Sequence, residues 1–150
     1  MHGANGVWVL CSADSGLYYS IDGKTWLASN IKSGGFRRAF YANGIWVATG
    51  TVDNGIYYSL NGQTWSTGNI KSGDFYCVHN ANGLWVAGSG ANGLYYSTNG
   101  RLWTKSNITS STFYSIYNAN GLWVAGGSSS RGILYSTDGK NWTSSNITSK

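Results

Sequence analysis

Short apolar segments alternate with polar turn residues along the whole chain. In the second quarter, the segments 36–41, 45–49, 55–59 and 64–70 are rich in aromatic and β-branched residues, so we expect four strands there. Asn43-Gly44 and Asn61-Gly62 separate neighbouring segments, and Asn-Gly pairs favour the positive φ angles of tight hairpins. The pattern therefore predicts a four-stranded antiparallel sheet with short connections.

This unit occurs four times. The motif Ala-Asn-Gly-x-Trp-Val recurs at Trp8, Trp46, Trp85 and Trp123, in steps of 38, 39 and 38 residues. A second motif, Ser-x-(Asp/Asn)-Gly-x-x-Trp, ends at Trp26, Trp65, Trp103 and Trp142. We divide the chain into repeats at about 1–34, 35–73, 74–111 and 112–150. The first repeat lacks a counterpart of segment 36–41, so we expect 15 strands, one fewer than four full sheets.

A period of this length with four strands per repeat predicts an all-β fold, the β-propeller, with each repeat forming one blade. We expect the tryptophans to pack between blades. The ring can be completed in two ways: a single chain forms a small four-bladed ring, or two chains associate into a larger ring of about eight blades. Blades at the ends of an open array would expose apolar faces, so we favour a homo-oligomer, and a dimer in particular.

Composition narrows the classes of function. The formal net charge is +5, but the ten basic residues are scattered rather than clustered, which argues against nucleic-acid binding. No segment resembles a signal peptide or a membrane span, so we expect no membrane insertion and leave the localisation open. His2, His79, Cys11 and Cys77 lack the spacing of a metal site, so we expect neither metal nor cofactor.

The second motif resembles the Asp-box, or BNR, repeat of sialidase-like propellers. Two copies, Ser20 to Trp26 and Ser136 to Trp142, contain Asp-Gly, while the other two contain Asn-Gly. In all four, the Asp or Asn directly precedes the glycine, whereas the usual Asp-box has one residue between them. The resemblance implies a structural hairpin with a buried aromatic residue. We therefore expect a structural role for Ser20, Asp22, Trp26, Ser59, Asn61, Trp65, Ser97, Asn99, Trp103, Ser136, Asp138 and Trp142. Similar short repeats occur in phage and bacterial surface or receptor-binding proteins.

Candidate binding residues lie where the repeats differ from one another. The hairpins after the first and third strands are nearly identical in all copies, whereas the loops between the second and third strands, and the links between repeats, vary. Loops on a rigid scaffold commonly carry binding groups. We therefore predict ligand-binding roles for Asp14, Asp53, Asn54, Asn92 and Arg131. With one of the two tyrosine sets, Tyr18, Tyr57 and Tyr95 or Tyr19, Tyr58, Tyr96 and Tyr135, facing outward, these groups would suit a carbohydrate.

The sequence argues against an enzyme. It contains no glutamate, and Asp14 and Asp53 are the only candidates for the paired carboxylates of glycoside hydrolysis. We expect a non-catalytic, lectin-like propeller whose partner is a glycan or a surface protein. The alternatives are a structural or receptor-binding module of a phage or bacterial surface assembly, an engineered or excised propeller fragment, and a degenerate glycoside hydrolase.

Overall fold

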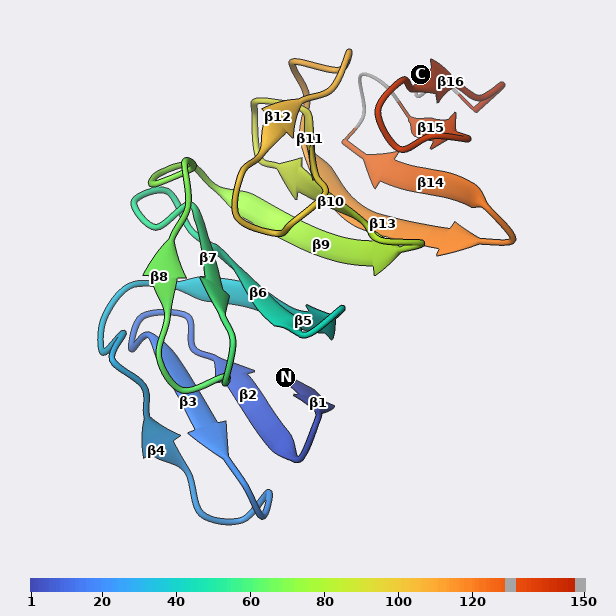
Figure 1. Cartoon of the computed structure of the whole chain (residues 1–150). Helices are drawn as coiled ribbons and strands as arrows, with labels where there is room; N and C mark the ends of the chain where they lie inside the picture. The colour runs from blue at the N-terminus through green and yellow to red at the C-terminus, as the bar shows by residue number, and fades with distance from the viewer. Residues whose placement is uncertain (129–131, 148–150) are drawn as a thin grey trace.

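A computed structural model describes residues 1–128 and 132–147. The described residues form four antiparallel four-stranded sheets, which confirms the all-β prediction (Figure 1). The strands are β1 (His2–Ala4), β2 (Val7–Cys11), β3 (Leu17–Ser20), β4 (Leu27–Ala28), β5 (Phe36–Ala42), β6 (Ile45–Gly50), β7 (Ile56–Ser59), β8 (Ser66–Thr67), β9 (Phe75–Ala81), β10 (Leu84–Ser89), β11 (Leu94–Ser97), β12 (Thr104–Lys105), β13 (Phe113–Ala119), β14 (Leu122–Gly127), β15 (Ile133–Ser136) and β16 (Thr143–Ser144).

Each repeat forms one sheet, which we call a blade and number from 1 to 4. The expectation that the first repeat lacks its first strand is wrong. β1 pairs with β2 in the register His2↔Val9 to Ala4↔Val7, the same register that Phe40↔Val47 and Ala42↔Ile45 keep in blade 2. The chain contains enough residues before Asn5-Gly6 to form the end of this strand, so blade 1 has all four strands.

The first hairpin of every blade is a two-residue turn. Asn5, Asn43, Asn82 and Asn120 have φ angles of 51–52°, and the glycines after them are also in the left-handed region. Two consecutive positive φ angles match the right-handed twist of the flanking strands.

The fourth strand of each blade is shorter than the sequence indicates. We predicted residues 64–70 as a strand, but β8 comprises Ser66 and Thr67 alone. The residues after it turn toward the next blade, where the backbone amide of Asn69 donates a hydrogen bond to the Arg101 carbonyl (3.4 Å). The residues after β8 therefore bond both to the next blade and to their own, where the Ile56 amide donates to the Ile70 carbonyl (3.0 Å).

The core consists of three apolar layers, one between each pair of neighbouring blades. In the first, Val9 and Leu17 of blade 1 pack with Trp46 and Trp65 of blade 2. The second and third layers repeat this arrangement between blades 2 and 3 and between blades 3 and 4. Trp46, Trp85 and Trp123 are 1–3% exposed, which confirms that these tryptophans pack between blades.

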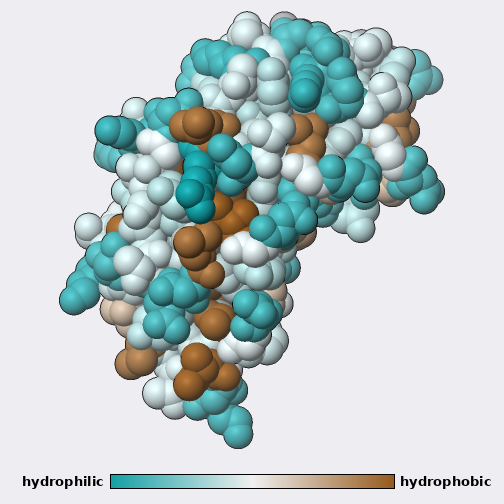
Figure 2. Space-filling view, viewed as in Figure 1, coloured by the Kyte–Doolittle hydropathy of each residue, from teal (hydrophilic) through white to brown (hydrophobic). Residues whose placement is uncertain are grey.

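The blades follow one another along an open arc, and the sheets do not close into a ring (Figure 1). Blade 1 and blade 4 therefore each have one face that no other blade covers. Trp8, the counterpart of buried Trp46, is 44% exposed. On the side seen in Figure 2, apolar side chains form separate patches among hydrophilic ones.

Candidate functional site

The hairpins that join the third and fourth strands share one set of hydrogen bonds. In blade 1, the Ser20 hydroxyl donates to Asp22 Oδ1 (3.0 Å) and accepts a hydrogen bond from the Gly23 amide (2.9 Å). Asp22 Oδ1 also accepts from the amides of Lys24 and Thr25. The equivalent bonds recur around Asn61, Asn99 and Asp138. One side-chain oxygen is enough for these contacts, so Asn serves as well as Asp.

Charge distinguishes the acidic hairpins from the amide ones. Hydrogen bonds from the Thr25 and Lys24 amides lower the pKa of Asp22 to about 2. Hydrogen bonds from the Asn141 amide and side chain likewise lower the pKa of Asp138 far below its ordinary value. Trp65, Trp103 and Trp142, which end these motifs in blades 2 to 4, are buried, whereas Trp26 of blade 1 is partly exposed.

A second polar contact joins neighbouring blades. The Asn30 side chain accepts a hydrogen bond from the Trp65 amide (2.8 Å) and donates one to the Trp65 carbonyl (2.9 Å). Asn69 makes the same pair with Trp103, and Asn107 makes it with Trp142. We call this contact the asparagine clamp. It satisfies two backbone groups that the short fourth strands leave unpaired.

The varied loops lie together at the opposite ends of the strands, and we call this side the loop edge. Backbone hydrogen bonds join each loop to the link between repeats: the Gly73 amide donates to the Val52 carbonyl and the Gly90 amide to the Asp74 carbonyl, both at 2.7 Å. The loops of blades 2 and 3 are therefore tied to the same link, residues 73–74.

The predicted ligand-binding residues are spread over this edge. Asp53 and Asn92 are exposed in the two loops that flank residues 73–74. Asp14 lies in the loop of blade 1, where it accepts a hydrogen bond from the Ser15 hydroxyl (2.8 Å). The side-chain nitrogen of Asn54 donates to the Gly35 carbonyl (3.5 Å) and so joins the loop to the link that precedes β5. Arg131 lies outside the described residues.

Sequence reasoning missed a cluster formed by the first strands of blades 2, 3 and 4. A β-bulge interrupts the pairing of the first strand in blades 2, 3 and 4, and the extra residues are Arg37, Tyr76 and Tyr114. The Arg37 guanidinium lies over the Tyr76 ring, 4.0 Å from its centroid, and the Tyr76 and Tyr114 rings are 5.2 Å apart. Bulges commonly re-aim side chains next to functional sites. The signal available in the sequence was that these three residues occupy the same position of the repeat, directly after Phe36, Phe75 and Phe113.

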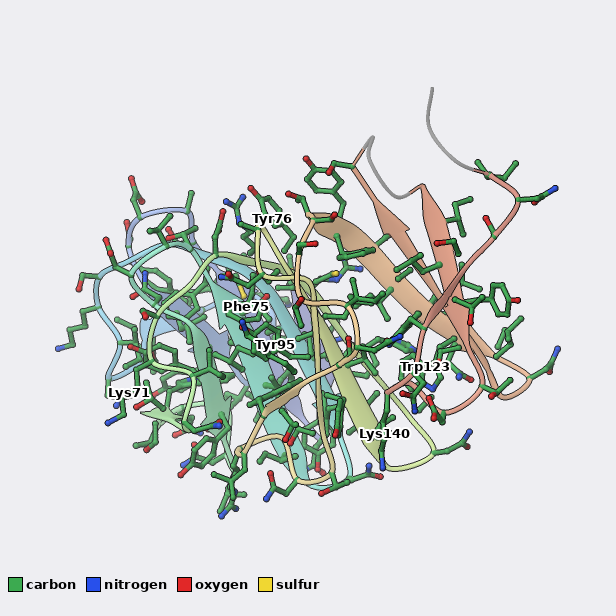
Figure 3. All side chains as sticks on the ribbon, turned by 90° about the horizontal axis from the view of Figure 1, so that it is seen from above. Lys71, Phe75, Tyr76, Tyr95, Trp123 and Lys140 are labelled. Atoms are coloured by element: carbon green, nitrogen blue, oxygen red, sulfur yellow. The ribbon has the colours of Figure 1, made fainter. Side chains whose placement is uncertain are left out.

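Asp74 completes this cluster, which we call the rim cluster. Its carboxylate accepts hydrogen bonds from Arg37 at 3.0 and 3.3 Å. A hydrogen bond from Tyr76 to Asp74 raises the pKa of the tyrosine. Tyr114, at the other end, is 54% exposed. Phe75 packs with Tyr95 inside blade 3, while Tyr76 points away from that pair (Figure 3). The cluster thus combines a free aromatic face with charged hydrogen-bonding groups.

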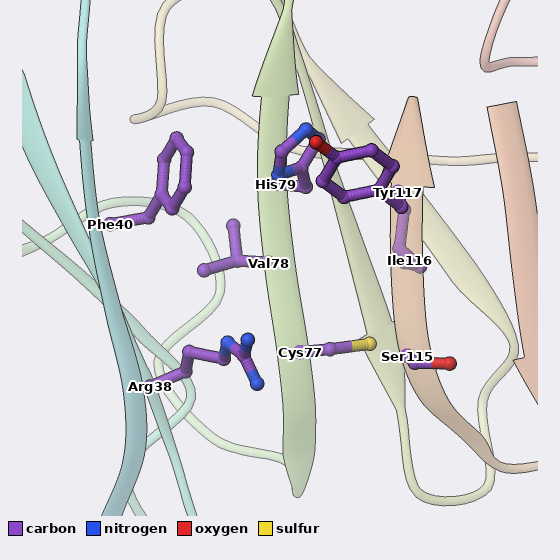
Figure 4. A pocket seen from close by; sticks show the side chains of 8 residues that line it. All are labelled: Arg38, Phe40, Cys77, Val78, His79, Ser115, Ile116 and Tyr117. Carbon is purple, nitrogen blue, oxygen red and sulfur yellow. The ribbon is translucent and has the colours of Figure 1, made fainter. Parts of the chain in front are cut away.

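The first strands lie on the concave side of the arc (Figure 1), and those of blades 2 to 4 carry two rows of side chains (Figure 4). His2, Phe40, His79 and Tyr117 form one row, with successive ring centroids 4.8–5.0 Å apart. The second row comprises Arg38, Cys77 and Ser115. These three residues and the part of the first row formed by Phe40, His79 and Tyr117 border a hollow of about 150 Å³. Burial lowers the pKa of His79, which favours its neutral form, and the ring packs here among aromatic groups.

Four of the candidate tyrosines pack against neighbouring side chains. Tyr57 and Tyr95 pack on Phe36 and Phe75, whereas Tyr58 and Tyr96 lie beneath Arg101 and Lys140 of the following blade. Cys11 and Cys77 are free thiols, and burial raises the pKa of each to about 12.

Within residues 1–128 and 132–147, no three His, Cys, Asp or Glu side chains are grouped closely enough to hold a metal ion. The same residues include no helix with the length and hydropathy of a membrane span.

Solved structures similar to this chain are propeller-like. The computationally designed Ika8 protein superposes with a TM-score of 0.69 at 10% identity, over 89% of this chain and 43% of that one. The GH74 xyloglucanase from Xanthomonas campestris gives 0.66 at 14% identity, over 92% and 28%. YCF48, bound to D1 peptide, gives 0.64 at 16% identity, over 94% and 50%.

The chain thus spans less than half the length of the first two proteins. These similarities support a propeller-like fold, and the four sheets of the chain are its blades. No protein-family model matches the sequence, and the comparison with curated proteins gave no match.

Proposed function

We propose that this chain is a non-catalytic binding propeller that holds a carbohydrate at its loop edge. The observation that carries the proposal is the rim cluster, where exposed Tyr114 lies beside Tyr76 and the Arg37–Asp74 ion pair. An aromatic face packs against the apolar C–H face of a sugar, while the guanidinium and carboxylate hydrogen-bond to its hydroxyls. Asp53 and Asn92, in the flanking loops, extend this polar surface.

The contacts of the aspartates support a role without catalysis. Asp22 and Asp138 accept hydrogen bonds within hairpins, and Asp74 is paired with Arg37. Asp14 accepts from a serine of its own loop. Two-carboxylate hydrolysis needs an acid and a base on either side of one bond, and Asp14 and Asp53 lie in loops of different blades. Loss of an observed hydrolase activity in the variants Asp14→Asn and Asp53→Asn would overturn this view.

The test is a glycan array, followed by titration of any sugar that binds. Tyr114→Ala should weaken binding roughly tenfold because it removes the stacking face. Tyr114→Phe keeps that face and should bind nearly as well. Leu102→Ala is the matched control, because Leu102 is 63% exposed on a hairpin away from the loop edge. Binding that is indifferent to Tyr114→Ala would remove the rim cluster from the proposal.

A second candidate is a protein-contact module, such as part of a phage or bacterial surface assembly. Val52, 63% exposed on the loop edge, favours a partner with an apolar contact. YCF48, one of the similar structures, is bound to a peptide. A blank glycan array together with loss of protein binding in Val52→Asp would favour this candidate over the first.

A further inference from the structure

The uncovered faces of blades 1 and 4 are the two halves of an interface that the chain already forms three times. Val9, Val47 and Val86 are fully buried against the next blade, whereas Val124, in the same place of blade 4, is 40% exposed. On the other side, Trp46, Trp85 and Trp123 are buried against the preceding blade, and Trp8 is 44% exposed. Val124 on blade 4 and Trp8 on blade 1 are therefore exposed, and packing these two faces together would bury both side chains.

The asparagine clamp is also divided between these faces. Asn146 of blade 4 corresponds to Asn30, Asn69 and Asn107, and no hydrogen bond joins its side chain to another described residue. The backbone around Asn146 is already in the clamp conformation: the Ser145 amide donates to the Ile133 carbonyl and the Ile147 amide to the Ser145 hydroxyl. The corresponding bonds hold the segment around Asn107. The backbone of Trp26, in blade 1, is the matching partner.

Two further contacts follow the same pattern. Arg101 lies over Tyr58 and Lys140 over Tyr96, each cation coming from the blade that follows the tyrosine. Lys24 of blade 1 and Tyr135 of blade 4 are the corresponding residues, and Tyr135 is 41% exposed. The row of rings on the concave side likewise ends with Tyr117 in blade 4 and His2 in blade 1.

We propose that the partner for both faces is a second copy of this chain, which docks blade 1 against blade 4 and blade 4 against blade 1. Such a head-to-tail contact closes when both ends meet, and two copies then share two identical seams. Closure of a single chain into a ring would require a larger angle between neighbouring blades, and this would deform each of the three apolar layers. Those layers are filled by fully buried valine and tryptophan side chains, and close-packed layers resist such deformation.

The first experiment is the mass of the native chain over a range of concentrations. The proposal predicts a species of twice the 16.1 kDa of one chain, which dissociates on dilution. A chain that stays at 16.1 kDa at every concentration would overturn it, and so would a larger open series of oligomers.

Substitutions in the seam identify the faces involved. Val124→Arg should weaken association roughly a hundredfold or more, because the seam would bury an unpaired charge, while the exposed position tolerates arginine in the single chain. Asn146→Ala removes the fourth clamp and should weaken association about tenfold. Leu60→Arg is the matched control: Leu60 is 63% exposed outside both faces, and its replacement should leave the mass unchanged.

Circular dichroism of each variant shows whether the blades remain folded. A folded Val124→Arg chain that still associates like the original would overturn the proposed seam even if a dimer exists. Neither outcome depends on the ligand of the loop edge, so the proposed function and the proposed seam can fail separately.

Discussion

The inner blades 2 and 3 and the terminal blades 1 and 4 have nearly the same sequence but different surroundings. Trp46 and Trp8 follow the same Ala-Asn-Gly turn, yet Trp46 is 1% exposed and Trp8 is 44% exposed. The hairpins between the third and fourth strands also differ in sequence: the inner blades carry Asn61 and Asn99, whereas the terminal blades carry Asp22 and Asp138. We therefore expect an identical motif to contribute differently to stability according to whether a neighbouring blade covers it.

The largest expected effect concerns the tryptophans. Trp46→Ala should lower the free energy of unfolding by about 3–5 kcal/mol, because it leaves a cavity in a packed layer. Trp8→Ala should cost clearly less in dilute protein, where its side chain is partly in water. Chemical denaturation of both variants measures the difference. Equal costs in dilute protein would mean that the blade 1 face is covered after all.

The asparagine clamps should give the next largest effect. Asn69→Ala leaves the Trp103 amide and carbonyl without partners and should destabilise the fold by about 1–3 kcal/mol. Asn146→Ala in the dilute chain should leave the melting temperature unchanged, because its side chain bonds no other described residue. Thermal unfolding monitored by circular dichroism checks both. An unchanged melting temperature for Asn69→Ala would show that water replaces the clamp at no cost.

The smallest expected effect is a pH dependence of the folding stability, which arises from the hairpin aspartates of the terminal blades. The folded-state pKa of Asp22 is about 2, below the ordinary value of 3.8, so its stabilising contribution is complete above the ordinary value and is lost as the pH falls toward the lower one. The pKa of Asp138 is lowered too, so it acts in the same direction. The double variant Asp22→Asn, Asp138→Asn should lose less stability than the original chain in this window.

Melting curves at several pH values measure this effect. Asn61→Asp is the reciprocal change, and it should introduce acid sensitivity into an inner blade. If the double variant and the original chain lose stability in parallel, the hairpin carboxylates do not cause the acid dependence.

Some features of the fold were evident in the sequence and others were not. Hairpin positions followed from Asn-Gly pairs, since their φ preferences are local. The short length of the fourth strands was not evident in the sequence, because β8 ends shortly before Asn69, whose side chain bonds to the next blade. The rim cluster was also missed: Arg37, Tyr76 and Tyr114 look like ordinary strand residues until the bulge turns them outward. The hydrogen bond from the Asn54 side chain to the Gly35 carbonyl was not evident either, because it joins two separate segments of the chain.

The sequence by itself determined the repeat, the all-β class and the position of each tight turn, because periodicity and backbone preference are properties of neighbouring residues. Only the tertiary structure decided which copies of a motif are buried and which side chains meet. Val124 and Val86 are equivalent in sequence, and their exposures of 40% and 0% arise because a blade follows one and not the other. Arg37 and Asp74 are paired because adjacent blades meet at the loop edge, a contact between residues far apart in the chain.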